Sequence, residues 1–156
     1  SLHDALPIFI VGFKKELGIK FDFPNPVIKR EEDYVPLKEV IEANVDEKYF
    51  FSQRAVDGMM RNRATMNKGR AQNIEEPCNT VGAHLAKVSL NSTDPVLMEG
   101  GRYRRFTPRE VARIQSFPDT FKLIESESAQ YRALGNAIPP VMFWYVMRAV
   151  KLALEQ

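Results

Sequence analysis

The stretch RRFTPREVARIQSFPDTF, residues 104–121, is followed after a short gap by YRALGNAIPP, residues 131–140. Each block joins a helix to a turn built from proline, glycine or asparagine. Composition alone does not produce this pairing, so the two blocks decide how the C-terminal third of the chain folds. The first predicts a short helix that ends on a Phe-Pro-Asp turn, and the second predicts a turn that leads into another helix.

The first block has a well-defined helix start. Thr107 can cap the helix, and Glu110, three residues on, can close a capping box. Pro108 falls at the first helical position, where its missing N–H costs nothing. The helix should stop before Pro118, because the residue preceding a proline is pushed out of the α region. Alone, this block would indicate no more than a short amphipathic helix with capped ends.

The second block places an asparagine on a predicted turn. Gly135-Asn136 suits a backbone turn with positive φ, and Pro139-Pro140 then starts a helix that runs to about Leu154. That helix is apolar around more than one face, which predicts that it is buried. Asn136 would therefore be held at the mouth of a buried helix, where it either contacts a ligand or caps its own turn.

These blocks resemble conserved motifs of the cytosine-C5 DNA methyltransferases. Residues 106–119 are similar to the ninth motif of that family, residues 130–140 to the tenth, and residues 8–13 to the end of the eighth. The resemblance implies an α/β fold: a fragment of a Rossmann-like S-adenosylmethionine-dependent methyltransferase that carries a small target-recognition domain. It also implies that the chain is the C-terminal portion of such an enzyme.

The resemblance divides the chain into three parts. Residues 1–20 would hold the last strand region of the catalytic domain, with a truncated or foreign N-terminal edge. Residues 21–100 would form the target-recognition region, and residues 101–156 would return to the catalytic domain with the ninth and tenth motifs.

The family methylates C5 of a cytosine that is flipped out of duplex DNA. A cysteine thiolate attacks C6, a glutamate assists at N3, and C5 takes a methyl group from S-adenosylmethionine. The motifs with this cysteine and glutamate lie upstream of the eighth motif, so the chain should hold no catalytic residue and be inactive alone. The single cysteine, Cys78, lies between the matches to the eighth and ninth motifs, where the family does not place its nucleophile. We interpret it as a small, partly buried thiol. Two alternatives stay open: a stand-alone DNA-recognition subunit of a split methyltransferase, or an inactive remnant.

The resemblance also assigns roles within the two late motifs. Asn136 would contact the methionine part of S-adenosylmethionine, while Gly135 and Ala137 would let the backbone come close to it. Four residues of the ninth motif would be architectural, bracing the recognition region against the catalytic domain: Thr107, Arg109, Glu110 and Arg113.

Charge is unevenly distributed, although the net charge is only +2. Residues 29–48 are rich in acids and residues 53–70 are basic, and the basic stretch lies where the family keeps its recognition region. Five side chains of this stretch are predicted to contact DNA, with a solvated helix face as the alternative: Arg54, Arg61, Arg63, Lys68 and Arg70.

The expected partners are duplex DNA with a flipped cytosine and the missing N-terminal catalytic half. Whether a cognate restriction endonuclease accompanies them stays open. No membrane partner is expected, since the N-terminal apolar run is far too short to span a bilayer, and His3 and His84 lack the spacing of metal ligands. A single cysteine fits a reducing compartment, and the resemblance implies the cytoplasm of a prokaryotic cell.

Outside the two blocks, the sequence predicts a mixture of short elements. We expect a buried strand over residues 8–13, helices over 36–43 and 49–66, and extended structure over 80–90. Loops are expected where proline, glycine and polar residues cluster, over 21–26, 67–75 and 91–101.

Overall fold

The computed structural model describes residues 9–23, 34–61, 71–87 and 94–155 of the chain. Within these residues the protein is mostly helical, with one two-stranded sheet. The helices are α1 (Gln53–Arg61), α2 (Pro108–Ile114), α3 (Glu127–Asn136) and α4 (Pro140–Leu154). The strands are β1 (Leu97–Glu99) and β2 (Arg102–Arg104), and the 3-10 turns are η1 (Lys15–Leu17), η3 (Leu37–Glu39), η4 (Glu47–Tyr49) and η5 (Leu85–Lys87).

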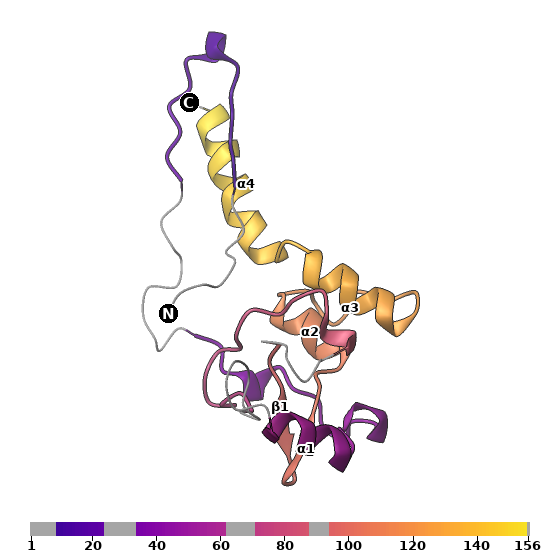
Figure 1. Ribbon diagram of the computed structural model, residues 1–156. Helices are drawn as coiled ribbons and strands as arrows, with labels where there is room; N and C mark the ends of the chain where they lie inside the picture. The colour runs from indigo at the N-terminus through magenta and orange to yellow at the C-terminus, as the bar shows by residue number, and fades with distance from the viewer. Residues whose placement is uncertain (1–8, 24–33, 62–70, 88–93, 156) are drawn as a thin grey trace.

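The elements form a body and an arm (Figure 1). The body holds α1, α2, α3 and the hairpin, while α4 extends away from it with the segment 9–23 running alongside. Phe9 and Phe143 stack where these two parts of the arm meet, with their ring centroids 6.5 Å apart. The first and last described segments of the chain thus lie together, away from the body.

The hydrophobic core of the body lies where α2, α3, η5 and β1 meet. Its buried members are drawn from separate parts of the chain: Leu37, Val81, Leu85, Leu97, Phe106, Val111, Ala112, Tyr131 and Leu134. The described residues of 34–61 and 71–87 therefore bury their apolar side chains against the C-terminal segment.

The predicted start of α2 is confirmed. The Thr107 hydroxyl accepts a hydrogen bond from the Glu110 N–H, and the Glu110 carboxylate accepts one from the Thr107 N–H, so the capping box is complete. Pro108 is the first helical residue, and Ser116 leaves the helix in the left-handed region with φ 63°.

A hairpin replaces part of the loop expected over residues 91–101. Leu97 pairs with Arg104 and Glu99 with Arg102, which leaves Gly100 and Gly101 as a two-residue turn. Both glycines have positive φ, 57° and 78°, as the favoured hairpin turn requires. The glycine pair between two short strands was the sequence signal for this hairpin, and the expectation of a loop up to residue 101 was wrong.

The expected strand over residues 8–13 is also wrong for its described part, since residues 9–13 belong to no strand. A strand needs a hydrogen-bonded neighbour, and Ile10 is instead 93% exposed. The expected α/β class is likewise not visible in this chain itself, because the sheet of the described residues is the antiparallel hairpin alone.

Three further elements differ from their predictions. In place of a helix over 36–43 there is only η3, because Leu37 and Lys38 donate their N–H groups to the carbonyls of Glu76 and Ile74. Helix 49–66 begins later, at Gln53, because residues 49–51 bond to β2 through Phe51 N and Tyr103 O, 2.9 Å apart. Residues 80–90 are not extended over their described part, which contains η5. Residues 62–66 and 88–90 lie outside the described chain.

Helix α4 has the predicted bounds but is not buried. Six of its large apolar side chains are 44–57% exposed: Val141, Phe143, Trp144, Met147, Leu152 and Leu154. By length and composition the segment Glu127–Leu154, in which an 18-residue window has a mean hydropathy of 1.3, would suffice to cross a membrane. The structure divides that segment into α3 and α4, and α4 alone has 15 residues, fewer than the ~20 that a spanning helix needs.

Candidate functional site

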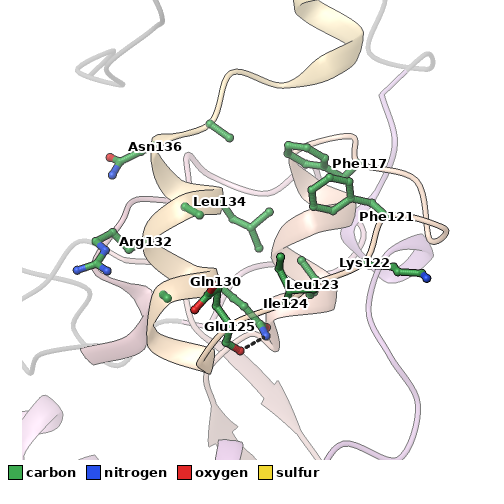
Figure 2. A pocket seen from close by; sticks show the side chains of 13 residues that line it. Phe117, Phe121, Lys122, Leu123, Ile124, Glu125, Gln130, Arg132, Leu134 and Asn136 are labelled. Carbon is green, nitrogen blue, oxygen red and sulfur yellow. Dashed lines mark hydrogen bonds between the residues drawn. The ribbon is translucent and has the colours of Figure 1, made fainter.

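Asn136 is the last residue of α3, and its placement corrects one expectation. Gly135 and Asn136 lie in the final helical turn and not in a positive-φ turn. The Asn136 side chain is exposed and has no hydrogen-bond partner within the described part of the chain. Figure 2 shows it on the same side of α3 as Arg132, pointing away from Phe117 and Phe121. Both hydrogen-bonding ends of the amide are thus free to meet a ligand.

Asn136 lies on a cavity of about 570 Å³ between α3, the start of α4 and the segment 78–81. Its polar lining comprises Asn79, Thr80, Gln115 and Asn136. Gln115 is already engaged, because its Nε2 donates to the Leu134 carbonyl at 2.9 Å. The polar side chains on the wall that have no hydrogen-bond partner among the described residues are therefore the short ones of Asn79, Thr80 and Asn136.

A second cavity, of about 700 Å³, lies on the other side of α3 and also reaches Asn136 and Ala137 (Figure 2). Its wall is mainly apolar, with Phe117, Phe121 and Leu123 among the lining side chains. Ala137 caps α3 by donating its N–H to the Leu134 carbonyl at 3.1 Å, and so it ends the helix between the two cavities.

Gly135 is required by close packing against the body. A Cβ added to Gly135 would lie 2.3 Å from the Ala83 nitrogen and 2.3 Å from the Gly82 carbonyl carbon. No side chain fits at that separation, so α3 lies directly on the Gly82-Ala83 peptide. Gly135 also lines the 570 Å³ cavity, and its expected close approach to a cofactor stays a prediction.

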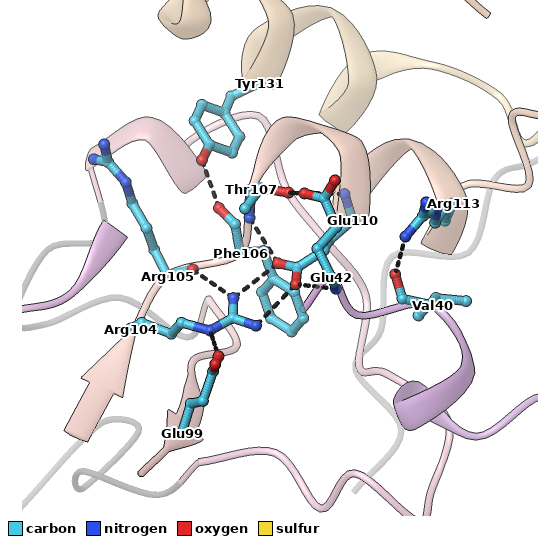
Figure 3. A network of polar contacts seen from close by, with 10 residues as sticks. All are labelled: Val40, Glu42, Glu99, Arg104, Arg105, Phe106, Thr107, Glu110, Arg113 and Tyr131. Carbon is cyan, nitrogen blue, oxygen red and sulfur yellow. Dashed lines mark hydrogen bonds and ion pairs between the residues drawn. The ribbon is translucent and has the colours of Figure 1, made fainter. Parts of the chain in front are cut away.

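The architectural residues form a buried polar network at the start of α2 (Figure 3). Glu110 is fully buried and accepts four hydrogen bonds: two from the Arg104 guanidinium at 2.8 and 2.9 Å, one from the Thr107 N–H at 2.8 Å and one from the Glu42 N–H at 2.8 Å. Burial opposes the charge on Arg104, but hydrogen bonds with Glu110 and Glu99 outweigh it and raise the pKa of the guanidinium. The Arg104 guanidinium therefore keeps its charge inside the body.

Two more residues of this set reach the 37–42 segment. The Thr107 hydroxyl donates to the Glu42 carboxylate. Arg113 donates to the Val40 carbonyl at 3.2 Å and forms a two-point ion pair with Asp119 at 2.8 and 2.9 Å. Arg109 is different, since it donates to the Phe121 carbonyl at 2.8 Å within the C-terminal segment. Thus Thr107, Glu110 and Arg113 join α2 to residues 40–42, and Arg109 does not.

A second ionic cluster surrounds Glu127, the first residue of α3. Its carboxylate accepts from Lys48 at 2.7 Å, from the Tyr49 hydroxyl at 3.1 Å and from Arg105 at 3.0 Å. Partial burial disfavours the charge, yet the hydrogen bonds from Lys48 and Tyr49 lower the pKa of the Glu127 carboxyl below its usual range. Sequence reasoning did not single out this cluster, because Tyr49 lies 78 residues and Arg105 22 residues from Glu127 in the chain.

The residues expected to contact DNA are only partly described. Arg54 is exposed on α1, and Arg61 is the last residue of that helix. Arg63, Lys68 and Arg70 lie outside the described residues, so the DNA-contacting role of the five stays a prediction. Arg102 of β2 is a further cation that the sequence analysis did not single out. Its guanidinium lies 4.5 Å from the centroid of the Phe50 ring.

Cys78 lines the 570 Å³ cavity as a partly buried thiol, as expected. Burial, aided by the charge of Glu110, raises the pKa of the thiol to about 12. A thiol of this kind is protonated at neutral pH and is a poor nucleophile. No cluster of three or more metal-ligating side chains occurs among the residues that the structure describes.

Comparison with known proteins gives a consistent result. Residues 8–152 match the family described as C-5 cytosine-specific DNA methylase. The chain is 30% identical to type II methyltransferase M.NgoPII of Neisseria gonorrhoeae over 96% of its own length and 51% of that relative, and 31% identical to M.NlaX of Neisseria lactamica over 95% and 47%.

Solved structures agree on the fold. The chain is similar to the Entamoeba histolytica methyltransferase EhMeth, with a TM-score of 0.64 at 18% identity over 86% of this chain and 46% of that one. It is also similar to Dnmt2 of S. pombe, with a TM-score of 0.59 at 19% identity over 81% and 42%. The chain therefore spans about half the length of the relatives that it matches.

Proposed function

This chain belongs to the C-5 cytosine-specific DNA methylase family, and we propose that it is the C-terminal portion of a DNA (cytosine-5-)-methyltransferase. The complete enzyme would transfer a methyl group from S-adenosylmethionine to C5 of cytosine in duplex DNA. The bacterial type II methyltransferases among its relatives suggest a restriction-modification setting in a prokaryotic cytoplasm.

The observation that supports the proposal most directly is the exposed apolar surface of the arm formed by α4 and residues 9–23. Helix α4 exposes six large apolar side chains, and the stacked Phe9–Phe143 pair joins it to the first described segment. Contiguous apolar surface of this kind marks an interface. Since the relatives are about twice as long, the partner we propose is the missing catalytic portion, with a Rossmann-like sheet, against which residues 9–20 and α4 would pack.

The Asn136 surface fits the cofactor in chemical terms. An amide donates to a carboxylate and accepts from an ammonium group, and the methionine part of S-adenosylmethionine carries both. Asn136 is exposed, faces a cavity and has no other hydrogen-bond partner among the described residues. When bound, the cofactor would supply an electrophilic methyl group, while Asn136 would orient its methionine end. Gly135 and Ala137 would act by holding the end of α3.

In this proposal the remaining residues act as scaffold and DNA surface. Residues 21–100 would form the target-recognition region, and the basic stretch with Arg54 would lie against the phosphates. The network around Glu110 would fix the 40–42 segment to α2. The attacking cysteine would come from the catalytic portion, because Cys78 is protonated at neutral pH. Cys78 also follows the match to the eighth motif, whereas the nucleophile of the family precedes that motif.

The test joins this chain to the half of M.NgoPII that it does not match. The assembly is assayed for transfer of labelled methyl groups to duplex DNA as the concentration of S-adenosylmethionine is varied. Asn136→Ala should raise KM for the cofactor about tenfold, since it removes two hydrogen bonds to a charged ligand end. Asn73→Ala is the matched control, because Asn73 bonds only within its own turn. An unchanged KM in Asn136→Ala would refute the cofactor assignment.

A further inference from the structure

Helix α3 is held at both ends by residues of the proposed recognition region. At its start, Glu127 binds Lys48 and Tyr49 of η4. At its end, Gly135 lies against the Gly82-Ala83 peptide, with no room for even a Cβ. A helix of 10 residues is about 15 Å long, so these two contacts fix both its axis and its axial position.

The middle of α3 is fixed as well. Tyr131 is fully buried and donates its hydroxyl to the Phe106 carbonyl, and the Arg105 guanidinium lies 6.0 Å from the centroid of the Tyr131 ring. Arg105 also lies 5.4 Å from the centroid of the Tyr49 ring and binds Glu127 at 3.0 Å. The same arginine therefore ties the start of α3 to η4.

Asn136 directly follows Gly135, and the Asn136 side chain makes no hydrogen bond to the described chain. Its position is consequently set by the two contacts that hold α3. A shift of about 1 Å in a group that orients a ligand is enough to cost much of its effect.

We propose that Glu127 and Gly135 are positioning residues that place the Asn136 amide for the cofactor by docking α3 onto the recognition region. Neither residue needs to touch the ligand. The inference rests on the proposed function, since it takes Asn136 as the residue that contacts S-adenosylmethionine.

The test measures equilibrium binding of S-adenosylmethionine, by calorimetry, to this chain joined to the unmatched half of M.NgoPII. Glu127→Gln keeps the side-chain size and removes the charge that binds Lys48 and Arg105. Glu125→Gln is its control, because the same change is made on an exposed side chain two residues earlier. Glu127→Gln should weaken cofactor binding about tenfold, and Glu125→Gln should leave it within about twofold.

A pair of glycine variants tests the other end. Gly135→Ala forces a Cβ into backbone atoms, whereas a Cβ at Gly82 would meet only the Asp94 carboxylate at 3.4 Å, an ordinary contact. Gly135→Ala should therefore weaken cofactor binding, and Gly82→Ala should not. If Gly135→Ala does not fold, the Glu127 variants carry the test alone.

A double-mutant cycle separates positioning from general loss of structure. If Glu127 acts through Asn136, then Glu127→Gln should have little further effect in a protein that already carries Asn136→Ala. Equal weakening in both backgrounds would overturn the inference, as would unchanged binding in Glu127→Gln. Should Asn136→Ala itself leave binding unchanged, the cofactor assignment fails, and that result is distinct from the failure of the positioning role alone.

Discussion

Replacing Arg104 with methionine should destabilise the body of the protein more than any surface change on the same strand. Arg104 is fully buried and bonds both carboxylate oxygens of Glu110, itself fully buried. Methionine keeps an unbranched, flexible apolar side chain and removes the guanidinium with its charge. Glu110 would then keep only the Thr107 and Glu42 N–H groups as partners, and its negative charge would be left in the interior.

The expected cost follows from that uncompensated charge. Removing one partner of a buried ion pair typically costs about 3–5 kcal/mol. For a chain of this size that corresponds to a fall of roughly 10 °C in Tm. Replacing both partners with apolar residues often restores stability, but here Arg104→Met with Glu110→Leu should not. The Thr107 and Glu42 N–H groups would lose their acceptor, at about 1–3 kcal/mol for each buried donor.

The assay is hydrogen exchange of the α2 amides, supported by urea denaturation followed by circular dichroism. Exchange of these amides reports opening of the body directly and does not depend on α4. Arg102→Met is the matched control, because Arg102 lies on the same strand and pairs with Glu47 in solvent, where an ion pair adds little. If Arg104→Met costs no more than Arg102→Met, or if the double apolar variant recovers full stability, the account of the Glu110 network is wrong.

Three further predictions follow from the same contacts. Cys78 should react slowly with a thiol reagent at pH 8 and rapidly after unfolding, because burial raises the pKa of its thiol to about 12; fast labelling of the folded chain would contradict this. The Glu127 carboxyl has a folded pKa below its ordinary 4.5, so its contribution to stability is present above that pH and is lost as the pH falls through the lower folded value. Glu127→Gln should accordingly flatten the decline of Tm in acid, and an identical decline would count against the cluster. The isolated chain should self-associate through the exposed face of α4, and Phe143→Ser with Trp144→Ser should reduce this in sedimentation; a purely monomeric wild-type chain would refute the interpretation of that face.

Features with local causes could be read from the sequence. The capping box of Thr107 and Glu110 and the proline start of α4 depend on neighbouring residues, and both were predicted with the bounds observed. The hairpin had a local signal as well, in Gly100-Gly101, but glycines between polar residues also occur in hinges. Its identification needed the pairing of Leu97 with Arg104.

Features with distant causes were missed or misread. Gly135 was taken for a turn residue, yet its need for glycine comes from a peptide more than fifty positions earlier in the chain, at Gly82-Ala83. Glu110 was recognised as a cap, but its bonds to Arg104 and Glu42 were not visible in a linear pattern. The strand expected over 8–13 depends on neighbours that the described residues do not supply.

The most direct test of the whole account is the amount of 5-methylcytosine in DNA from cells that express the unmatched half of M.NgoPII with and without this chain. The two parts should produce methylated cytosine together, and neither should do so alone, because one would bring the nucleophile and the other Asn136 and the recognition region. Methylation by this chain alone, or none from a soluble complex of the two parts, would contradict its role as the C-terminal portion of the enzyme.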